Sequence, residues 1–474
     1  MQHLLTSSRR TVSVSEVLAL VLLAPVALAA CEMVGDEQVT TETGTVLMTD
    51  NMTNPNGMHA TVSTTGSINT SNEFFQSLGT NGRTCATCHD AADAWGIAPP
   101  HVLSRFNSSQ GLDPIFRLND GANSPKAPVA TLAQRQAAYT QLTQRGLIRV
   151  GMPLPANAEF TLTFVEDPYT FATANEMSLY RRPLPSTNLK FLSGVMWDGR
   201  ETVPGNTMFQ NLMKQSNDAT LGHAQAAAPL TTQQQTNIVN FETALFTAQV
   251  SDNVAGSLTS GGVNGGPAFL STQNFYIGIN DPLGGNPQGT PFTSKAMTLY
   301  DAWANQSGSP AADRRASIAR GQAIFNTRQF QVIGVKGVND VLFGNLNTPL
   351  TATCSTCHDT PNAGNHSVSL PLDLGLTDPN TYNTDVMPRY TLTNKTTGAT
   401  IRTSDPGKAM LTGKWADIAK FKGPILRGLS GRAPYFHNGF ASSLQALVTF
   451  YDQRFHIGLD ATQTPDLVNF LQTL

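Results

Sequence analysis

Cysteine is scarce in this sequence of 474 residues, which contains only five. So few thiols exclude a disulfide-rich secreted scaffold, and each cysteine that is present needs its own explanation. Charge is scarce as well, since 13% of the residues are Asp, Glu, Lys or Arg and the formal net charge is −3. A chain without a basic excess has no electrostatic basis for attracting nucleic acid, and we therefore expect no nucleic-acid partner.

Long hydrophobic runs are also lacking. The apolar run at residues 17–30 follows Arg9 and Arg10 and is too short for a membrane-spanning helix. It is typical of a secretory signal peptide, and its end, Leu-Ala-Ala before Cys31, resembles a bacterial lipoprotein cleavage site. The alternative is ordinary cleavage nearby, which would leave Cys31 as a spare thiol.

Residues 1–31 are therefore predicted to be a lipoprotein signal peptide with its lipobox. Lipidation of Cys31 would anchor the mature protein to a bacterial membrane on the periplasmic side. Glu32 follows Cys31 in place of the aspartate that retains many lipoproteins at the inner membrane. This difference favours the outer membrane.

The other four cysteines form two Cys-x-x-Cys pairs, each followed directly by a histidine. These triads are Cys85, Cys88 and His89, and Cys354, Cys357 and His358. Two disulfides would leave the histidines unexplained. A zinc site would leave the wide separation of the two pairs unexplained. Covalent haem uses every residue, because the thiols form thioethers with the porphyrin and the histidine ligates the iron. The sequence therefore predicts two haem c groups, with both histidines as proximal ligands.

Composition and helical spacing of apolar residues, as at Ile238, Phe241 and Leu245, predict a mainly α fold with two cytochrome-c-like haem domains and long loops. The expected divisions are a flexible tether at residues 32–70, an N-terminal c-haem domain at 71–250, a linker or insertion at 251–310 and a C-terminal c-haem domain at 311–474. Each half then contains one haem motif.

Two further motifs carry a family resemblance. The sequence Met-Trp-Asp-Gly-Arg-Glu occupies residues 196–201, and residues 421–440 read FKGPILRGLSGRAPYFHNGF. Together with the two haem motifs, they resemble the bacterial dihaem cytochrome c peroxidase and MauG superfamily over roughly residues 72–474. The resemblance implies that hydrogen peroxide reacts at the N-terminal haem. The C-terminal haem would then exchange electrons with a small periplasmic redox protein or a protein substrate.

The resemblance also suggests roles for single residues. Trp197, in the first of these motifs, matches a tryptophan that lies between the two haems and passes charge. Tyr451 matches the sixth ligand of the C-terminal haem, where peroxidases have methionine and MauG has tyrosine. Met387 and Met410 remain alternative ligands. A phenolate is a hard anionic donor, which favours oxidised iron.

A calcium ion lies between the haems of many relatives, and the match here is incomplete. Arg432 and Pro434 match its backbone-carbonyl ligands. The asparagine side chain that completes the family's site is missing, because Arg182 stands near the expected position and Asn188 is too close to Trp197. Calcium is therefore left open as a cofactor.

The family's acid–base glutamate is missing as well. Peroxide cleavage needs a group that takes up and returns a proton, and relatives place a glutamate about twenty residues after the motif tryptophan. No glutamate lies between Glu201 and Glu242. The polar candidates near the expected position are Gln215, Asn217, Asp218 and His223. We predict an oxidoreductase whose peroxide turnover is in question, and the alternative is a lipid-anchored dihaem electron carrier.

Overall fold

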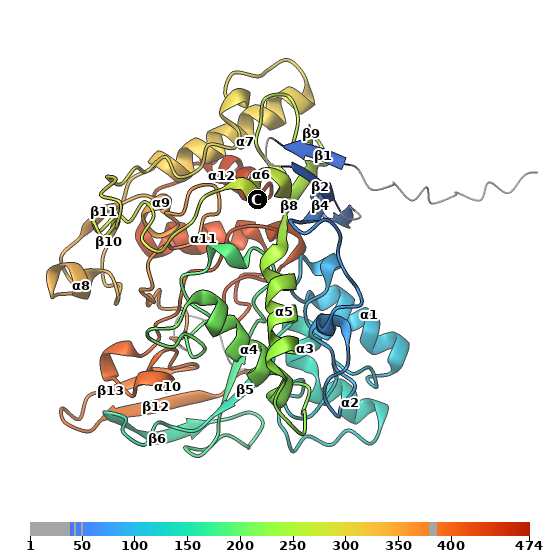
Figure 1. Ribbon diagram of the computed structural model, residues 1–474. Helices are drawn as coiled ribbons and strands as arrows, with labels where there is room; N and C mark the ends of the chain where they lie inside the picture. The colour runs from blue at the N-terminus through green and yellow to red at the C-terminus, as the bar shows by residue number, and fades with distance from the viewer. Residues whose placement is uncertain (1–37, 42–43, 49–50, 379–385) are drawn as a thin grey trace, which may run out of the picture. The chain divides into compact units, whose positions relative to one another are not determined.

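The computed structural model describes residues 38–41, 44–48, 51–378 and 386–474 (Figure 1). The predicted signal peptide and the predicted lipidation site, Cys31, lie outside these residues. Within the described ranges, no helix combines the length and the apolar character that a membrane span needs.

A mixed architecture replaces the predicted mainly α fold. The described residues contain twelve α-helices and thirteen β-strands. The largest sheet has six strands, in the order β1-β2-β4-β8-β9 with β3 paired to β4. Its strands are β1 (Gln38–Thr41), β2 (Gly44–Met48), β3 (Met52–Asn54), β4 (Gly57–Ser63), β8 (Leu245–Asp252) and β9 (Gly256–Ser257).

Strand β4 corrects the prediction of a flexible tether at residues 32–70. It pairs antiparallel with β8, placing Ala60 opposite Ala248, and almost all of its residues are buried. His59, on the same strand, is fully buried and places Nε2 2.9 Å from the carbonyl oxygen of Ala91. This segment is a structural strand, although its sequence is polar enough to resemble a linker.

The first haem motif lies among short helices. They are α1 (Pro99–Ser109), α2 (Leu132–Ala138), α3 (Thr140–Arg145), α4 (Met208–Gly222) and α5 (Thr232–Ala244). Helices α4 and α5 pack on each other, and each begins with a capping box, formed by Thr207 with Gln210 and by Thr231 with Gln234. These caps satisfy backbone N–H groups that a helix start leaves without partners. They fix where the two helices begin beside the motif.

The second motif belongs to a helical and loop region. Its elements are α6 (Gly266–Thr272), α7 (Pro310–Thr327), α8 (Asn339–Phe343), α9 (Cys354–Cys357), α10 (Ala409–Thr412), α11 (Leu444–Phe455), α12 (Gln463–Leu471), β10 (Phe330–Val332) and β11 (Leu350–Ala352). Helices α7 and α12 pack together. Tyr300 and Trp303, which fall in the predicted linker at 251–310, are buried in the same core cluster as Phe325 and Phe470. This segment is part of the C-terminal core rather than a connection.

Strands from the two halves of the chain also pair with each other. Strand β6 (Phe160–Glu166) pairs antiparallel with β12 (Arg389–Asn394), and β13 (Thr400–Thr403) completes the sheet (Figure 1). A two-stranded antiparallel sheet of β5 (Ile148–Met152) and β7 (Met177–Arg181), which lie on either side of β6 in the chain, packs beside it. The described residues between Gln38 and Leu474 belong to one compact unit. The two halves therefore share sheets and do not fold as the separate domains that the sequence predicted.

Candidate functional site

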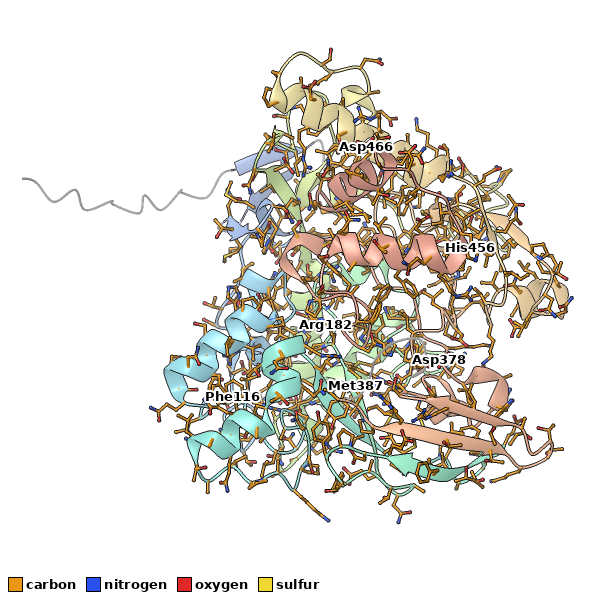
Figure 2. All side chains as sticks on the ribbon, turned by 180° about the vertical axis from the view of Figure 1, so that it is seen from behind. Phe116, Arg182, Asp378, Met387, His456 and Asp466 are labelled. Atoms are coloured by element: carbon orange, nitrogen blue, oxygen red, sulfur yellow. The ribbon has the colours of Figure 1, made fainter. Side chains whose placement is uncertain are left out.

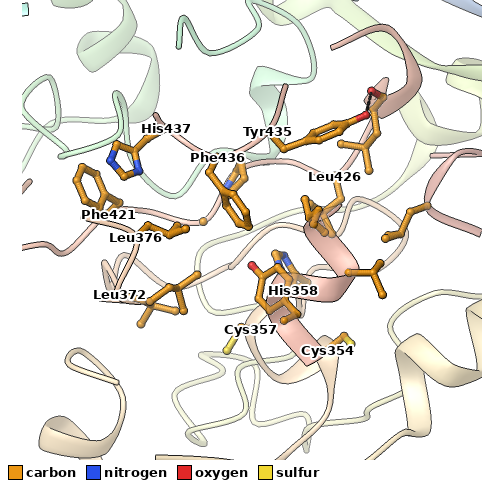
Figure 3. Close-up of a pocket in the computed structure, with 18 of the residues that line it drawn as sticks. Cys354, Cys357, His358, Leu372, Leu376, Phe421, Leu426, Tyr435, Phe436 and His437 are labelled. Carbon is orange, nitrogen blue, oxygen red and sulfur yellow. Dashed lines mark hydrogen bonds between the residues drawn. The ribbon is translucent and has the colours of Figure 1, made fainter. Parts of the chain in front are cut away.

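Two cavities contain the two Cys-x-x-Cys-His triads. The first cavity is lined by Cys85, Cys88 and His89 together with residues of α4 and α5. The second cavity is lined by the triad at residues 354–358 together with residues of α11 and α12. Figure 3 shows His358 on one side of the second cavity, opposite the loop that carries its labelled aromatic side chains.

The first triad is folded by local hydrogen bonds. Cys85–Thr87 form a short 3₁₀ helix, and the backbone N–H of Thr84 donates to Oγ1 of Thr87 over 2.9 Å. Nδ1 of His89 lies 3.1 Å from the carbonyl oxygen of Trp95. This contact fixes the imidazole orientation and leaves Nε2 to ligate a metal. Burial lowers the pKa of His89 to about 4, so the imidazole is neutral, as a ligand must be.

The second triad repeats this arrangement. The backbone N–H of Thr353 donates to Oγ1 of Thr356 over 2.9 Å, at the start of α9. Nδ1 of His358 lies 2.9 Å from the carbonyl oxygen of Gly364. Burial lowers the pKa of His358 to about 4. Both triads therefore present a neutral, oriented imidazole beside two thiols.

The donor set fits covalent haem better than its alternatives. All four cysteines of the triads are free thiols. Burial raises the pKa of Cys354 and of Cys357 to about 12, which disfavours the thiolate that disulfide exchange requires. In the part of the chain that the structure describes, no group of three or more His, Cys, Asp or Glu side chains could hold a metal ion. Two thiols and one imidazole on each cavity wall are the groups that haem c attachment uses.

Polar side chains occupy part of the first cavity. Gln215 and His223 both line it. Nδ1 of His223 lies 2.5 Å from Oδ2 of Asp120, which also accepts a hydrogen bond from Arg83. Burial alone would raise the pKa of Asp120, but the bond to His223 and the charge of Arg83 outweigh it and lower that pKa. His223 is thus held by a carboxylate at the cavity edge.

Asn217 does not line this cavity, although the sequence made it a candidate for the position of the family's acid–base glutamate. Its Oδ1 accepts a hydrogen bond from the backbone N–H of Leu230 over 3.0 Å. Its Nδ2 donates to Asp218 over 3.1 Å, and Asp218 pairs with Lys214 at 2.6 Å. Asn217 therefore joins α4 to the segment before α5.

Glu242 is the residue that the sequence analysis missed. It lies on α5, lines the first cavity and is only 6% exposed. Its Oε2 has no hydrogen-bond partner among the described residues. Burial raises the pKa of Glu242 to about 8, so the carboxyl group is mostly protonated at neutral pH. Its position four residues after buried Ile238 places it on the inward face of α5, a signal that the sequence did contain.

Trp197 lines both cavities. Its indole N–H donates to the carbonyl oxygen of Arg182 over 2.8 Å, and its own carbonyl accepts from the backbone N–H of Lys422 over 2.8 Å. The centroid of its ring lies 6.2 Å from that of His437, in an edge-on arrangement. His437 in turn stacks on Phe421 at 3.9 Å. The indole is fixed at the wall that the two cavities share.

Buried ion pairs support this wall. Asp198, beside Trp197, contacts Arg181 at 2.5 Å and Arg200 at 3.2 Å. Arg181 also donates from Nε to Asp405 over 2.7 Å. Burial would raise the pKa of Asp198, but the charges of Arg181 and Arg200 outweigh it and hold that pKa at about 2. The motif around the tryptophan is therefore anchored by charge.

Tyr451 lines the second cavity and packs near Cys357. Burial, and then the nearby cysteines, raise its pKa. Met387 lies in a cluster with Leu147 and Tyr180, away from α11 (Figure 2). Met410 lies in the cluster around strands β6 and β12. Of the predicted candidates for a sixth ligand, only Tyr451 lines this cavity in the described part of the chain.

The predicted calcium ligands also lie at the second cavity. Arg432 and Pro434 line it. The carbonyl oxygen of Arg432 accepts a hydrogen bond from Nη2 of Arg182 over 3.0 Å. That carbonyl therefore already has a cationic partner from the chain itself.

Comparisons with known proteins give partial matches. No family model matches the sequence. The chain is 32% identical over 143 residues to the cytochrome-c peroxidase IdrP1 of Pseudomonas sp. (strain SCT), covering 26% of this chain and 36% of that protein. It is 27% identical over 202 residues to the cytochrome-c peroxidase IdrP1 of Denitromonas iodatirespirans, covering 40% of this chain and 47% of that protein. A solved MauG-like protein associated with microbial copper homeostasis aligns with 13% identity and a TM-score of 0.29. The alignment covers 64% of this chain and 77% of that protein.

The alignments thus span between about a third and a half of the length of these curated relatives. They support the resemblance to the bacterial cytochrome c peroxidase and MauG superfamily that the motifs carry. Covalent haem c is the cofactor that this class implies.

Proposed function

We propose that this protein is a dihaem c-type oxidoreductase of the peroxidase and MauG type. Hydrogen peroxide reacts in the first cavity, and electrons are exchanged through Trp197 and the second cavity with an external donor or a protein substrate. The observation that carries the proposal is that Trp197 lines both cavities that contain a Cys-x-x-Cys-His triad. An indole can be oxidised, and it shortens the gap that an electron must otherwise cross.

The division of roles rests on the two cavity linings. The bound haems supply the reactivity toward peroxide and the one-electron exchange. In the first cavity, Glu242 offers a carboxyl group without a partner at Oε2, which can hold and return a proton. Gln215 can orient a bound molecule but cannot carry its proton. In the second cavity, the phenolic oxygen of Tyr451 would be available to bind the haem iron.

The surroundings of the protein are part of the same proposal. Lipidation of Cys31 would hold it at the periplasmic face of the outer membrane. Its electron partner would then be a small periplasmic redox protein or a protein substrate. Replacement of Cys31 by Ser, followed by membrane fractionation, tests this: release of the variant supports anchoring, and a wild type already found in the soluble fraction contradicts it.

A second function is favoured by one observation. Helix α4 contributes the amide of Gln215 to the first cavity, and none of its described residues that line the cavity is a carboxylate. A lipid-anchored electron carrier without peroxide turnover would need no proton-carrying group there. Glu242 is the reason to favour the enzyme.

Mass spectrometry and optical spectra test the proposal. The mature protein should carry two haems, and its resting ferric spectrum should combine a high-spin and a low-spin component. Addition of peroxide should produce defined spectral changes that a reductant reverses. Fewer than two haems contradicts the proposal, and mere bleaching by peroxide supports the carrier.

A further inference from the structure

Arg182 places its guanidinium group in a shell of backbone carbonyl oxygens. Nη1 donates to the carbonyl oxygen of Arg145 over 2.8 Å and lies 3.5 Å from the carbonyl oxygen of Gly146. Nη2 donates to the carbonyls of Ile97 over 2.5 Å and Arg432 over 3.0 Å. Such a cluster of carbonyl oxygens is the kind of environment in which hard cations are bound. Here the chain supplies the cation itself.

The fit of the guanidinium depends on a glycine. Gly146 has a φ of +61°, and a Cβ atom at this position would lie 2.2 Å from Nη1 of Arg182. A side chain at residue 146 would therefore collide with the guanidinium or displace it. The close approach indicates that the shell is shaped around Arg182, which is only 6% exposed.

The charges around the shell disfavour an additional divalent ion. No carboxylate forms an ion pair with Arg182 within the described ranges, and Arg432 and Lys422 also line the second cavity. Burial, and then the charge of Arg432, lower the pKa of Arg182 to about 10, so it is still charged at neutral pH. The negative charge of Asp93 raises the pKa of Arg182, but Asp93 already contacts His101 at 2.5 Å. A calcium ion would enter next to cations at close range, where like charges repel strongly.

Arg182 also connects the parts that surround the cavities. Its backbone N–H donates to the carbonyl of His437 over 2.7 Å, and its own carbonyl accepts the indole N–H of Trp197. The side chain holds residues 97 and 145–146 of the first half and residue 432 of the second. A bound cation in this place would make the same connection through carbonyl oxygens.

We propose that the guanidinium of Arg182 takes the place of the calcium ion that relatives bind between their haems, and that this protein binds no calcium there. The residues do not fit calcium: the carbonyl of Arg432 is already bonded to Arg182, and Arg182 stands where the family's asparagine ligand is expected. The sequence left calcium at Arg432 and Pro434 open, and this proposal argues against it. The inference concerns the wall between the cavities and does not depend on which reaction they perform.

Metal analysis of the holoprotein is the direct test. The wild type is equilibrated with calcium chloride, passed through a desalting column and analysed by inductively coupled plasma mass spectrometry. No stoichiometric calcium is expected, and the Tm should be the same in calcium and in EGTA. About one retained calcium per chain, with a lower Tm in EGTA, overturns the proposal.

Two variants sharpen the test. Arg182→Asn removes the guanidinium and restores an amide oxygen, so its Tm in EGTA should fall by about 5 °C, and calcium should recover part of the loss. Arg182→Lys, the matched control, keeps a cation in the shell and should remain insensitive to calcium. If the Tm of Arg182→Asn equals that of the wild type, or if calcium restores none of the lost Tm, the guanidinium does not take the place of a bound calcium ion. The wild-type metal content decides the question even if Arg182→Asn fails to fold.

Discussion

The two Cys-x-x-Cys-His sites are built alike and surrounded differently. In each, a threonine before the first cysteine bonds a threonine within the motif, and the histidine Nδ1 contacts a carbonyl six residues further on, at 3.1 Å for His89 and 2.9 Å for His358. The first cavity then contains the partnerless carboxyl of Glu242, whereas the second contains the phenol of Tyr451 among apolar side chains.

This comparison separates attachment from chemistry. Attachment is local, because a few consecutive residues determine the fold of each triad and the orientation of its imidazole. The differences come from segments distant in sequence: α4 and α5 at the first cavity, and α11 with the loop before it at the second. Tertiary structure therefore gives two like attachment sites different surroundings, and in the proposed function these would give two identical cofactors different roles.

The largest effect is expected from removing one attachment site at a time. Cys85→Ala with Cys88→Ala should leave one haem and abolish the reaction with peroxide. Cys354→Ala with Cys357→Ala should also leave one haem but retain that reaction, while electron exchange with an external donor is lost. Mass spectrometry counts the haems and stopped-flow spectroscopy follows peroxide. Equal loss of the peroxide reaction in both variants would mean that the cavities do not have separate roles.

The next effect concerns the proton-carrying group of the first cavity. Glu242→Gln should slow peroxide consumption by about 100-fold, because an amide cannot accept a proton. Because the pKa of Glu242 is about 8, the wild-type rate should rise as pH increases through 8, where the carboxylate forms. The variant should lose this dependence.

Gln215→Leu is the matched control for Glu242→Gln, since it changes another polar residue of the same cavity. It should preserve the pH dependence even if the rate falls. A Glu242→Gln variant with an unchanged rate and pH profile would show that Glu242 does not carry the proton.

The wall shared by both cavities should be weakened by Asp198→Asn. The charges of Arg181 and Arg200 hold the pKa of Asp198 at about 2, below its value of about 3.9 in an unfolded chain. This pairing stabilises the fold above about pH 4, and its contribution is lost as pH falls toward 2. We expect a loss of about 2–3 kcal/mol in the free energy of unfolding at pH 7, with less difference from the wild type at low pH.

Thermal or denaturant unfolding at pH 7 and pH 3 measures this effect. Asp218→Asn is the control, because Asp218 pairs with Lys214 at the surface and such a pair contributes about 0.5 kcal/mol or less. If Asp198→Asn costs no more than Asp218→Asn, the buried charges do not support the wall.

A smaller and purely local change is expected for Tyr451→Phe. Loss of the phenolic oxygen should convert the low-spin ferric signal of the second haem toward high spin and raise its potential, while the first haem is unchanged. Electron paramagnetic resonance and potentiometry measure both. Met387→Leu should change neither the spin state nor the potential of the second haem. If Met387→Leu changes them and Tyr451→Phe does not, Met387 is the ligand.

What the sequence could predict follows from how local each feature is. The triads could be recognised because haem attachment uses nearly adjacent residues, and Trp197 could be picked out because it lies in a short motif that carries the family resemblance. The structure places both on cavity walls. Strand β4 could not, since its place depends on pairing with β8 nearly two hundred residues away, and its polar sequence resembles a linker. The shell of carbonyl oxygens around Arg182 could not be predicted either, because every residue has a backbone oxygen and the sequence does not show which ones come together. Glu242 was missed because it is on α5, whereas the family's spacing pointed to α4.

Electron transfer between the two haems in Trp197→Phe tests the central claim most directly. The variant should retain both haems and react with peroxide in the first cavity as the wild type does. The subsequent change of the second haem, followed by stopped-flow spectroscopy, should slow by about tenfold or more. Trp415→Phe, which changes a tryptophan packed against Phe160, should leave this rate unchanged. Equal rates in Trp197→Phe and the wild type would contradict the proposal that Trp197 connects the two cavities.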